Sequence, residues 1–207
     1  MPFNIRDIKA GLIYDGARES HFSIDIIFPA SLSRIFGSIP SVGLNSEGNL
    51  NGTISVEQKI QYTGRSSSFP ASVNEPITVD YFGRPMKLAG NRTFDDWTVN
   101  FYNDEDFVIK NTFDNWLAAI NGHENNVRQP RFGVGRSQLD YKASGLIHGW
   151  DKTGTKILKS VEMVGMFPIN VGEISADWSS NEVQTFDVTF AYDYWQSPEL
   201  QDEISGR

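Results

Sequence analysis

The sequence predicts a mainly β protein, an antiparallel β-sandwich or barrel-like fold with one packed α-helix over about residues 104–121. Apolar and polar residues alternate in several segments, and Gly, Pro, Asn and Ser separate those segments, as expected for strands joined by turns. Only one segment changes to a helical period. A chain of 207 residues with 39% hydrophobic content can bury a sizeable core, and its length favours a single domain over residues 1–207.

The helix is predicted from the stretch between Leu88 and Gly122, in which the hydrophobic period changes from two to about 3.6. Asn103 is a candidate N-cap, the acidic residues at 104–106 favour the positive end of a helix dipole, and Gly122 is a candidate left-handed stop. The apolar stripe between them consists of Ile109, Phe113, Trp116, Leu117 and Ile120. This pattern indicates an amphipathic helix that lies on a sheet.

The strands are predicted from alternation over residues 21–28, 53–62, 92–102, 139–150, 156–167, 173–178 and 185–194. In the segment 53–62, Ile54, Val56, Ile60 and Tyr62 would share one face. Residues 151–154 fit the turn of a hairpin, and Gly83 to Pro85 fit a hairpin tip within residues 77–88. Residues 168–172 are expected to form a corner.

Polar and Gly-rich segments are predicted to lie outside the regular elements. Loop insertions are expected near 30–52 and 63–76, and flexible ends over residues 1–20 and 196–207. Arg128, Arg131 and Arg136 make the densest positive cluster, and a solvated loop or inter-subunit salt bridges are favoured over phosphate binding.

Large apolar residues on the predicted strands and helix are expected to anchor the core. They are Phe94, Trp97, Phe101, Phe113, Trp116, Trp178, Phe186, Phe190 and Tyr194. Core packing is favoured over base stacking for the tryptophans, because four of the five lie on predicted strands or the helix stripe.

Composition limits the classes of function. A net charge of -8 disfavours a protein that grips nucleic acid by neutralising phosphates. The absence of cysteine excludes disulfides and thiolate zinc sites. No signal peptide or long apolar run is visible, so a soluble chain without membrane insertion is expected.

No catalytic constellation emerges from the sequence. His21, His123 and His148 stand in three separate segments, without metal-ligand spacing. Asp95 and Asp96 are adjacent on a predicted strand and would point to opposite faces, so a turn or interface role is favoured over a metal pair. Gly133 and Gly135 give only G-x-G without the strand and helix of a phosphate loop. The sequence therefore predicts no enzyme, cofactor or metal.

Two blocks carry a family resemblance. The first, AGNRTFDDWTVNFYNDED over residues 89–106, resembles tail tube proteins of contractile-tailed phages of the T4 type. The second, GMFPINVGEISADWSSNEVQTFDVTFAYDYW over residues 165–195, is similar to the carboxy-terminal third of the same proteins. Together the blocks cover about a quarter of the chain, in the family's order.

The resemblance implies a tail-tube fold, six subunits in a ring, and rings stacked into a tube through which DNA leaves the virion. It implies self-association, together with tail sheath, baseplate and tape-measure partners, and DNA that passes without specific binding. It also implies assembly in the host cytoplasm and residence in the virion tail. Residues 77–90 resemble the arm that reaches toward the neighbouring ring. The expected subunit or ring interface consists of Tyr81, Arg84, Met86, Arg92, Asp95 and Asp96.

Alternative functions stay open at this point. A baseplate tube-initiator or tail-terminator protein would share the fold, and an Hcp-like secretion tube protein would share the assembly physics. A hydrolytic enzyme of the particle would need a clustered acid or nucleophile.

Overall fold

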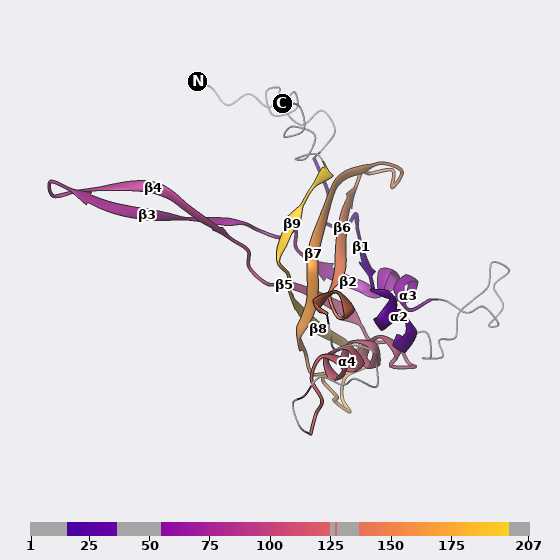
Figure 1. The fold of residues 1–207 in the computed structure, drawn as a ribbon. Coiled ribbons are helices and arrows are strands. Elements are labelled where there is room, and N and C mark those ends of the chain that lie inside the picture. Colours follow the sequence, from indigo (N-terminus) through magenta and orange to yellow (C-terminus); the bar gives the residue numbers. More distant parts are fainter. Residues whose placement is uncertain (1–15, 37–54, 125–126, 128–136, 199–207) are drawn as a thin grey trace.

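The computed structural model describes residues 16–36, 55–124, 127 and 137–198, and within them the fold is mainly antiparallel β. The predicted fold class is therefore confirmed. Strands form a seven-stranded sheet in the order β1-β6-β7-β8-β5-β2, with β9 on β7, and a separate β3–β4 ribbon (Figure 1). The elements are β1 Phe22–Ile27, α2 Ala30–Phe36, α3 Val56–Thr63, β2 Gly64–Ser67, β3 Val73–Tyr81, β4 Arg84–Thr93, β5 Trp97–Tyr102, α4 Val108–Ile120, the 3₁₀-helix Gln138–Asp140, β6 Ala143–Trp150, β7 Ile157–Val171, β8 Thr185–Ala191 and β9 Tyr194–Gln196.

The long strand β7 holds the sheet together. Its first part pairs with β6 and β9, and its last residues pair with β8. Gly165 directly follows the part of β7 that pairs with β9 and has a φ of +72°, and a Cβ there would collide with the Asp193 carboxylate. A glycine is needed at this position, because other residues rarely adopt that backbone conformation.

The core is one continuous cluster between the sheet and the helices. Phe113 and Trp116 of α4 pack on Phe190 of β8, with ring centroids 5.7 and 6.2 Å apart. The indole Nε1 of Trp116 donates a hydrogen bond to the Tyr141 carbonyl at 2.9 Å, so its polar atom is satisfied inside the core. The prediction that the apolar stripe of this helix, α4, lies on a sheet is therefore confirmed.

The helix α3 lies between the two ends of the sheet. Ile60 of α3 is fully buried, and Gly64, which follows α3 directly, packs against the Ile24 side chain of β1. Because β1 and β2 end the path of hydrogen-bonded strands in the described part of the chain, α3 seals the core where the sheet stays open.

The predicted strand over residues 53–62 is wrong, because its described part, from Ser55 on, leads into α3. Ser55 and Gln58 form a capping box, in which the Ser55 hydroxyl accepts from Gln58 N and the Gln58 side chain accepts from Ser55 N. The buried residues Val56 and Ile60 are four residues apart, a spacing that fits one face of a helix and also fits one face of a strand.

The expectation of one helix is also wrong, since the described residues contain α2, α3 and α4. Residues 30–36 of the expected loop form α2, in which Leu32 and Phe36 are buried four residues apart. Residues 37–52 of that loop lie outside the described residues. The expected loop 63–76 contains β2 and the start of β3.

The predicted helix 104–121 begins four residues late, at Val108, and ends at Ile120. Asn103 does not cap it. Phe107 occupies the N-cap position with a φ of +54°, and the Asp104 carboxylate accepts from Ile109 N at 3.4 Å. The chain leaves α4 through Asn121 in an extended conformation, and Gly122 does not have a positive φ.

The other predicted strands met mixed outcomes. The strand at 21–28 and the hairpin around the turn 151–154 are confirmed as β1 and β6–β7. The segment 92–102 is divided between β4 and β5, and the expected corner at Pro168 lies inside β7. Residues 173–178 form no strand, and the last strand divides into β8 and β9.

The expected flexible tail begins too early, because Gln196 belongs to β9 and Ser197 is buried. The Ser197 hydroxyl donates a hydrogen bond to the Ser160 carbonyl at 2.8 Å. The remaining expectations for residues 1–15 and for Arg128, Arg131 and Arg136 lie outside the described residues.

Candidate assembly surfaces

A two-stranded ribbon, here called the arm (residues 73–93), projects away from the main sheet (Figure 1). Its strands β3 and β4 meet at a turn in which Phe82 and Gly83 both have positive φ, 47° and 76°. Near its base, a Cβ on Gly90 would collide with the Glu75 carbonyl, so the close approach there needs a glycine. The hairpin predicted within residues 77–88 is present, and its tip is one residue earlier than expected.

The arm has one apolar and one polar face. The cross-strand pairs Ile77–Leu88, Val79–Met86 and Tyr81–Arg84 lie on the apolar face, and Thr78–Lys87, Asp80–Pro85 and Asn74–Arg92 lie on the polar face. Apolar side chains of the arm are 41–91% exposed. A lone two-stranded ribbon is marginally stable in water, so an uncovered apolar face of this length indicates a surface that is completed by a partner.

The expected interface residues fall in two places. Tyr81, Arg84 and Met86 lie on the apolar face near the tip of the arm. Arg92 lies on the polar face, and Asp95 and Asp96 are exposed in the connection between β4 and β5. The structure thus brings the first three together and separates them from the others.

The connection at the base of the arm contacts Tyr192. Phe94 is half-buried there, with its ring centroid 6.1 Å from that of Tyr192, and the Arg92 guanidinium lies 5.9 Å from the Phe94 centroid. Burial raises the pKa of the Tyr192 phenol, and the charges of Asp95 and Asp96 raise it further. Phe94 therefore packs at the base of the arm and is not one of the buried core residues.

Most of the expected core anchors are inside. Trp97, Phe101, Phe113, Trp116, Phe186 and Phe190 are all at most 2% exposed. The expectation is wrong for Tyr194, which is 45% exposed on β9, and for Trp178, which is fully exposed. Trp178 lies in the turn Asp177–Ser180, because the Asp177 carboxylate accepts from Ser179 N and ends the alternating pattern.

The outward side of β5 and β8 is mainly polar, and most of its side chains are short. The exception is Tyr102, whose ring centroid lies 5.7 Å from the guanidinium of Arg65 on the neighbouring strand β2. The Thr98 and Thr189 hydroxyls are 3.2 Å apart, and Asn100 donates from its amide to Asp187 Oδ1 at 2.8 Å. Neither strand contains Lys or Arg. The polar groups of this face are largely paired with one another, which leaves few donors for a ligand.

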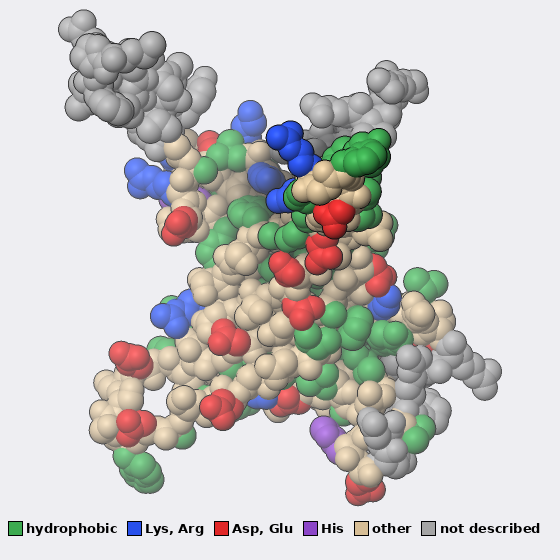
Figure 2. All heavy atoms as spheres, turned by 90° about the vertical axis from the view of Figure 1, so that its left-hand side faces the viewer, with side chains coloured by type: hydrophobic (Ala, Val, Ile, Leu, Met, Phe, Trp, Pro, Cys, Tyr) green, Lys and Arg blue, Asp and Glu red, His purple; other side chains and the backbone are tan. Residues whose placement is uncertain are grey.

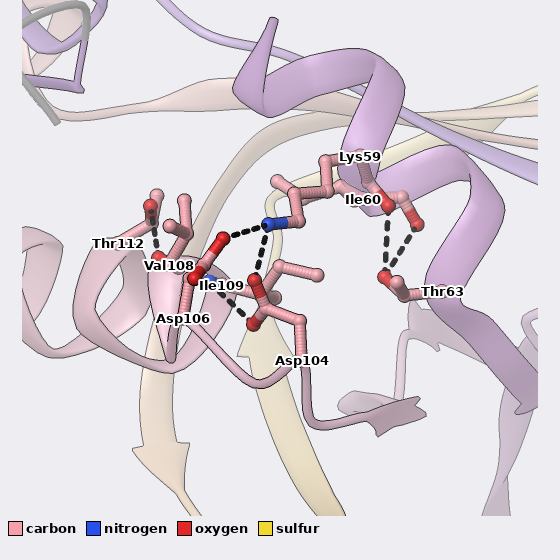
Figure 3. A network of polar contacts seen from close by, with 8 residues as sticks. All are labelled: Lys59, Ile60, Thr63, Asp104, Asp106, Val108, Ile109 and Thr112. Atoms are coloured by element: carbon pink, nitrogen blue, oxygen red, sulfur yellow. Dashed lines mark hydrogen bonds and ion pairs between the residues drawn. The ribbon is translucent and has the colours of Figure 1, made fainter. Parts of the chain in front are cut away.

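Figure 3 shows a polar network that ties α3 to the start of α4. The Lys59 ammonium forms an ion pair with Asp104 and lies 3.7 Å from the Asp106 carboxylate. The side chains of Lys59 and Asp104 are only 14% and 13% exposed. This pair links two helices in a largely desolvated place, and its role is to position them.

The structure supports no catalytic site in the part of the chain that it describes. His148 Nε2 lies 3.6 Å from Asp25 Oδ2 across β1 and β6, and the His21 ring nitrogen Nδ1 lies 3.2 Å from the hydroxyl of its neighbour Ser20. No group of metal-binding side chains gathers within the described residues. Within them, no helix is both long and apolar enough to span a bilayer.

A sealed core, an uncovered apolar arm and a polar sheet face define an assembly subunit, a structural protein whose surfaces meet other chains. The family model for phage tail tube proteins matches residues 17–197. The tail tube protein gp19 of Enterobacteria phage T4 is 36% identical over 140 residues, which span 67% of this chain and 82% of gp19. The chain belongs to the phage tail tube protein family and is therefore a structural virion protein, not an enzyme.

Solved structures support the fold. The sheath/tube terminator of an extracellular contractile injection system aligns with a TM-score of 0.55 at 15% identity, over 88% of this chain and 96% of the other. A chain from the sheath–tube complex of an extracellular contractile injection system aligns with a TM-score of 0.52 at 15% identity, over 94% and 99%.

Proposed function

We propose that copies of this chain assemble into hexameric rings, and that the rings stack into the inner tube of a contractile tail. The observation that carries this proposal is the arm, whose apolar face stays uncovered in a single subunit. A neighbouring copy would bury that face and pair with the open edges of β3 and β4, which an isolated ribbon leaves without hydrogen-bond partners.

The polar face of β5 and β8 fits the surface of a channel. The threonine, asparagine and aspartate side chains of these two strands carry no cation, and Arg65 of the neighbouring β2 is the one cation that the structure places over this face, at Tyr102, among the described residues. The chain as a whole carries a net charge of -8. Six copies would carry roughly -48, so DNA would pass along the bore without binding it. A repulsive wall favours rapid exit because it forms no ion pairs with the backbone of DNA.

The other expected partners are proposed from the resemblance to the family. The tube would contact the tail sheath outside, the baseplate at one end and a tape-measure chain inside, after assembly in the host cytoplasm. One relative comes from a sheath–tube complex, which supports the sheath contact by analogy. The fold is proposed to act as one domain over residues 1–207.

A matched pair of substitutions on the arm tests the proposal. Val79→Lys places a charge on the apolar face, and the neighbouring Thr78→Lys places the same charge on the polar face. Both positions are exposed in the subunit, so both variants should fold like the parent chain. Negative-stain microscopy should show rings or tubes with a central hole for the parent and Thr78→Lys, and monomers for Val79→Lys.

Unchanged tubes from Val79→Lys would show that the apolar face of the arm is not an assembly surface. A parent chain that stays monomeric at high concentration and with its baseplate would refute the tube function. Counting copies in virions separates a tube subunit, present in many rings, from a tube initiator or terminator, present in one or two.

A further inference from the structure

A basic hollow lies beside the turn between β6 and β7. It has a volume of about 680 Å³, and its lining includes Arg18, Trp150, Lys156 and Leu158. The Trp150 indole is fixed in place, because its Nε1 donates to the Ser23 hydroxyl at 3.0 Å. The hollow therefore combines a fixed aromatic wall, an aliphatic side chain and cationic groups.

The one carboxylate in this lining is directed into its own turn. Asp151 accepts hydrogen bonds from the Thr153 hydroxyl at 2.7 Å and from Thr155 N at 3.1 Å. These bonds hold the pKa of Asp151 below its ordinary value, and the bond from the Thr153 hydroxyl has the largest effect. The cationic groups around the hollow consequently outnumber the single paired carboxylate.

The connection between β7 and β8, here called the acidic loop (residues 172–184), has the opposite character. It contains Glu173, Asp177 and Glu182 and no Lys or Arg. Trp178 at its turn is fully exposed, and Val183 is 67% exposed. An indole exposed entirely to water, in a loop with three carboxylates and no cation, is unusual for a side chain of this size and indicates a contact with another molecule.

The hollow and the acidic loop lie at opposite ends of the subunit. The turn next to the hollow precedes the first residue of β7, and the acidic loop follows the last residue of that 15-residue strand. A strand of this length spans roughly 50 Å, so one subunit cannot bring the two together. In Figure 2, Lys and Arg side chains gather toward the upper end, and Asp and Glu prevail below.

We propose that the acidic loop of one copy docks into the basic hollow of the next copy, with Trp178 seated against Trp150 and Leu158. This inference rests on the proposed tube function and names a contact between stacked subunits. A contact between two different surfaces at opposite ends does not close on itself, so it extends into a stack. Cation–π and ion-pair attraction from Lys156 would add to burial of the indole.

The tip of the arm is a poorer occupant of the same hollow. It carries two cations, Arg84 and Lys87, against one carboxylate, Asp80, and those cations would meet the cationic lining of the hollow. Like charges brought together at a contact disfavour it, so charge selects the acidic loop over the arm.

Disulfide trapping tests the contact, because the chain has no native cysteine. Ser179→Cys, next to Trp178, and Ala17→Cys, in the lining of the hollow, are combined in one chain that keeps the Trp178, Trp150 and Leu158 side chains. Tubes are then assembled and mild oxidant is added. Docking brings the two thiols of neighbouring copies within disulfide reach, so denaturing gels without reductant should show a ladder of linked chains. The control combines Ala17→Cys with Thr98→Cys, which lies on the polar face of β5, and this pair should give no ladder.

Charge exchange gives an independent measurement. Lys156→Glu should reduce the fraction of chains in sedimenting tubes by about tenfold, and adding Glu182→Lys to the same chain should restore it. This contact would be overturned, and the tube function would stand, if tubes form normally, no ladder of linked chains appears, and Lys156→Glu leaves the fraction of chains in sedimenting tubes unchanged. A parent chain that forms no tubes would overturn the tube function and this contact together.

Discussion

Replacing Lys59 by Met tests whether the ion pair between α3 and the start of α4 holds the two helices in place. Methionine keeps the length and apolar stem of lysine and removes only its charge. Asp104, whose side chain is 13% exposed, would then lose its counter-ion while remaining largely buried. Removing one partner of a fully buried pair costs about 3–5 kcal/mol, and the residual exposure here lowers the expected loss to about 2–3 kcal/mol.

Lys110→Met is the matched control. Its ammonium pairs with Asp114 at 2.9 Å along the surface of α4, where the Asp114 side chain is 46% exposed. It also lies 5.9 Å from the Phe186 ring centroid. An exposed pair four residues apart on a helix, even with a weak cation–π contact, should cost less than about 1 kcal/mol.

Both substitutions are best measured in the Val79→Lys background, which should be monomeric, so that unfolding is not coupled to disassembly. Urea unfolding followed by tryptophan fluorescence gives the free energies. For a domain of this size the Lys59→Met loss corresponds to a fall in Tm of roughly 4–12 °C. Two losses that agree within about 0.5 kcal/mol would contradict a desolvated ion pair at Lys59. So would a Lys59 effect that 1 M salt abolishes, as salt should abolish the Lys110 effect.

Three further predictions concern single side chains. Trp116→Ala should destabilise the subunit by about 3–5 kcal/mol in the same urea assay, because it leaves a cavity in the core and removes the hydrogen bond from the Trp116 indole to the Tyr141 carbonyl. Phe82→Asn should leave the circular dichroism spectrum of the subunit unchanged and stabilise the turn of the arm, since asparagine tolerates a positive φ better than phenylalanine. If this variant forms no tubes, the Phe82 side chain is needed for assembly, which would explain why a strained residue is kept there. Ser179→Ala should raise the pKa of Asp177 in an NMR titration yet keep it below 3.8, because the backbone hydrogen bond from residue 179, the larger cause of the lowering, remains. Since folding lowers this pKa, the small contribution of Asp177 to stability is present above pH 3.8 and is lost as pH falls through the folded value.

Strands with one buried face were predictable from the sequence, because their apolar side chains are buried and alternate with exposed polar ones. In β8, Phe186, Val188 and Phe190 are all buried, and the same rule located β1 and β6. Residues 173–178 alternate equally well and form no strand, since their pattern ends in an exposed turn around Trp178. Alternation over six residues therefore cannot separate a strand from an extended loop.

The segment that forms α3 was predicted as a strand because Val56 and Ile60 are four residues apart. That separation places two residues on the same face of a strand and also on the same face of a helix. The capping box Ser55-Val56-Glu57-Gln58 was the signal that could have separated them. The uncovered apolar face of the arm was also within reach of the sequence, since Ile77, Val79 and Tyr81 alternate. The molecule proposed to cover that face is a second chain, and the alternation of one sequence gives no information on where that second chain lies.

The length of β7 has a mechanical consequence. If copies join through the hollow and the acidic loop, a pull along the stack enters each subunit at one end of β7 and leaves at the other, carried by covalent bonds. The hydrogen bonds of β7 to β6 and β8 run across the strand, so they resist sliding as a group and do not break one at a time. Under tension, the joints between copies would therefore part before any subunit stretched.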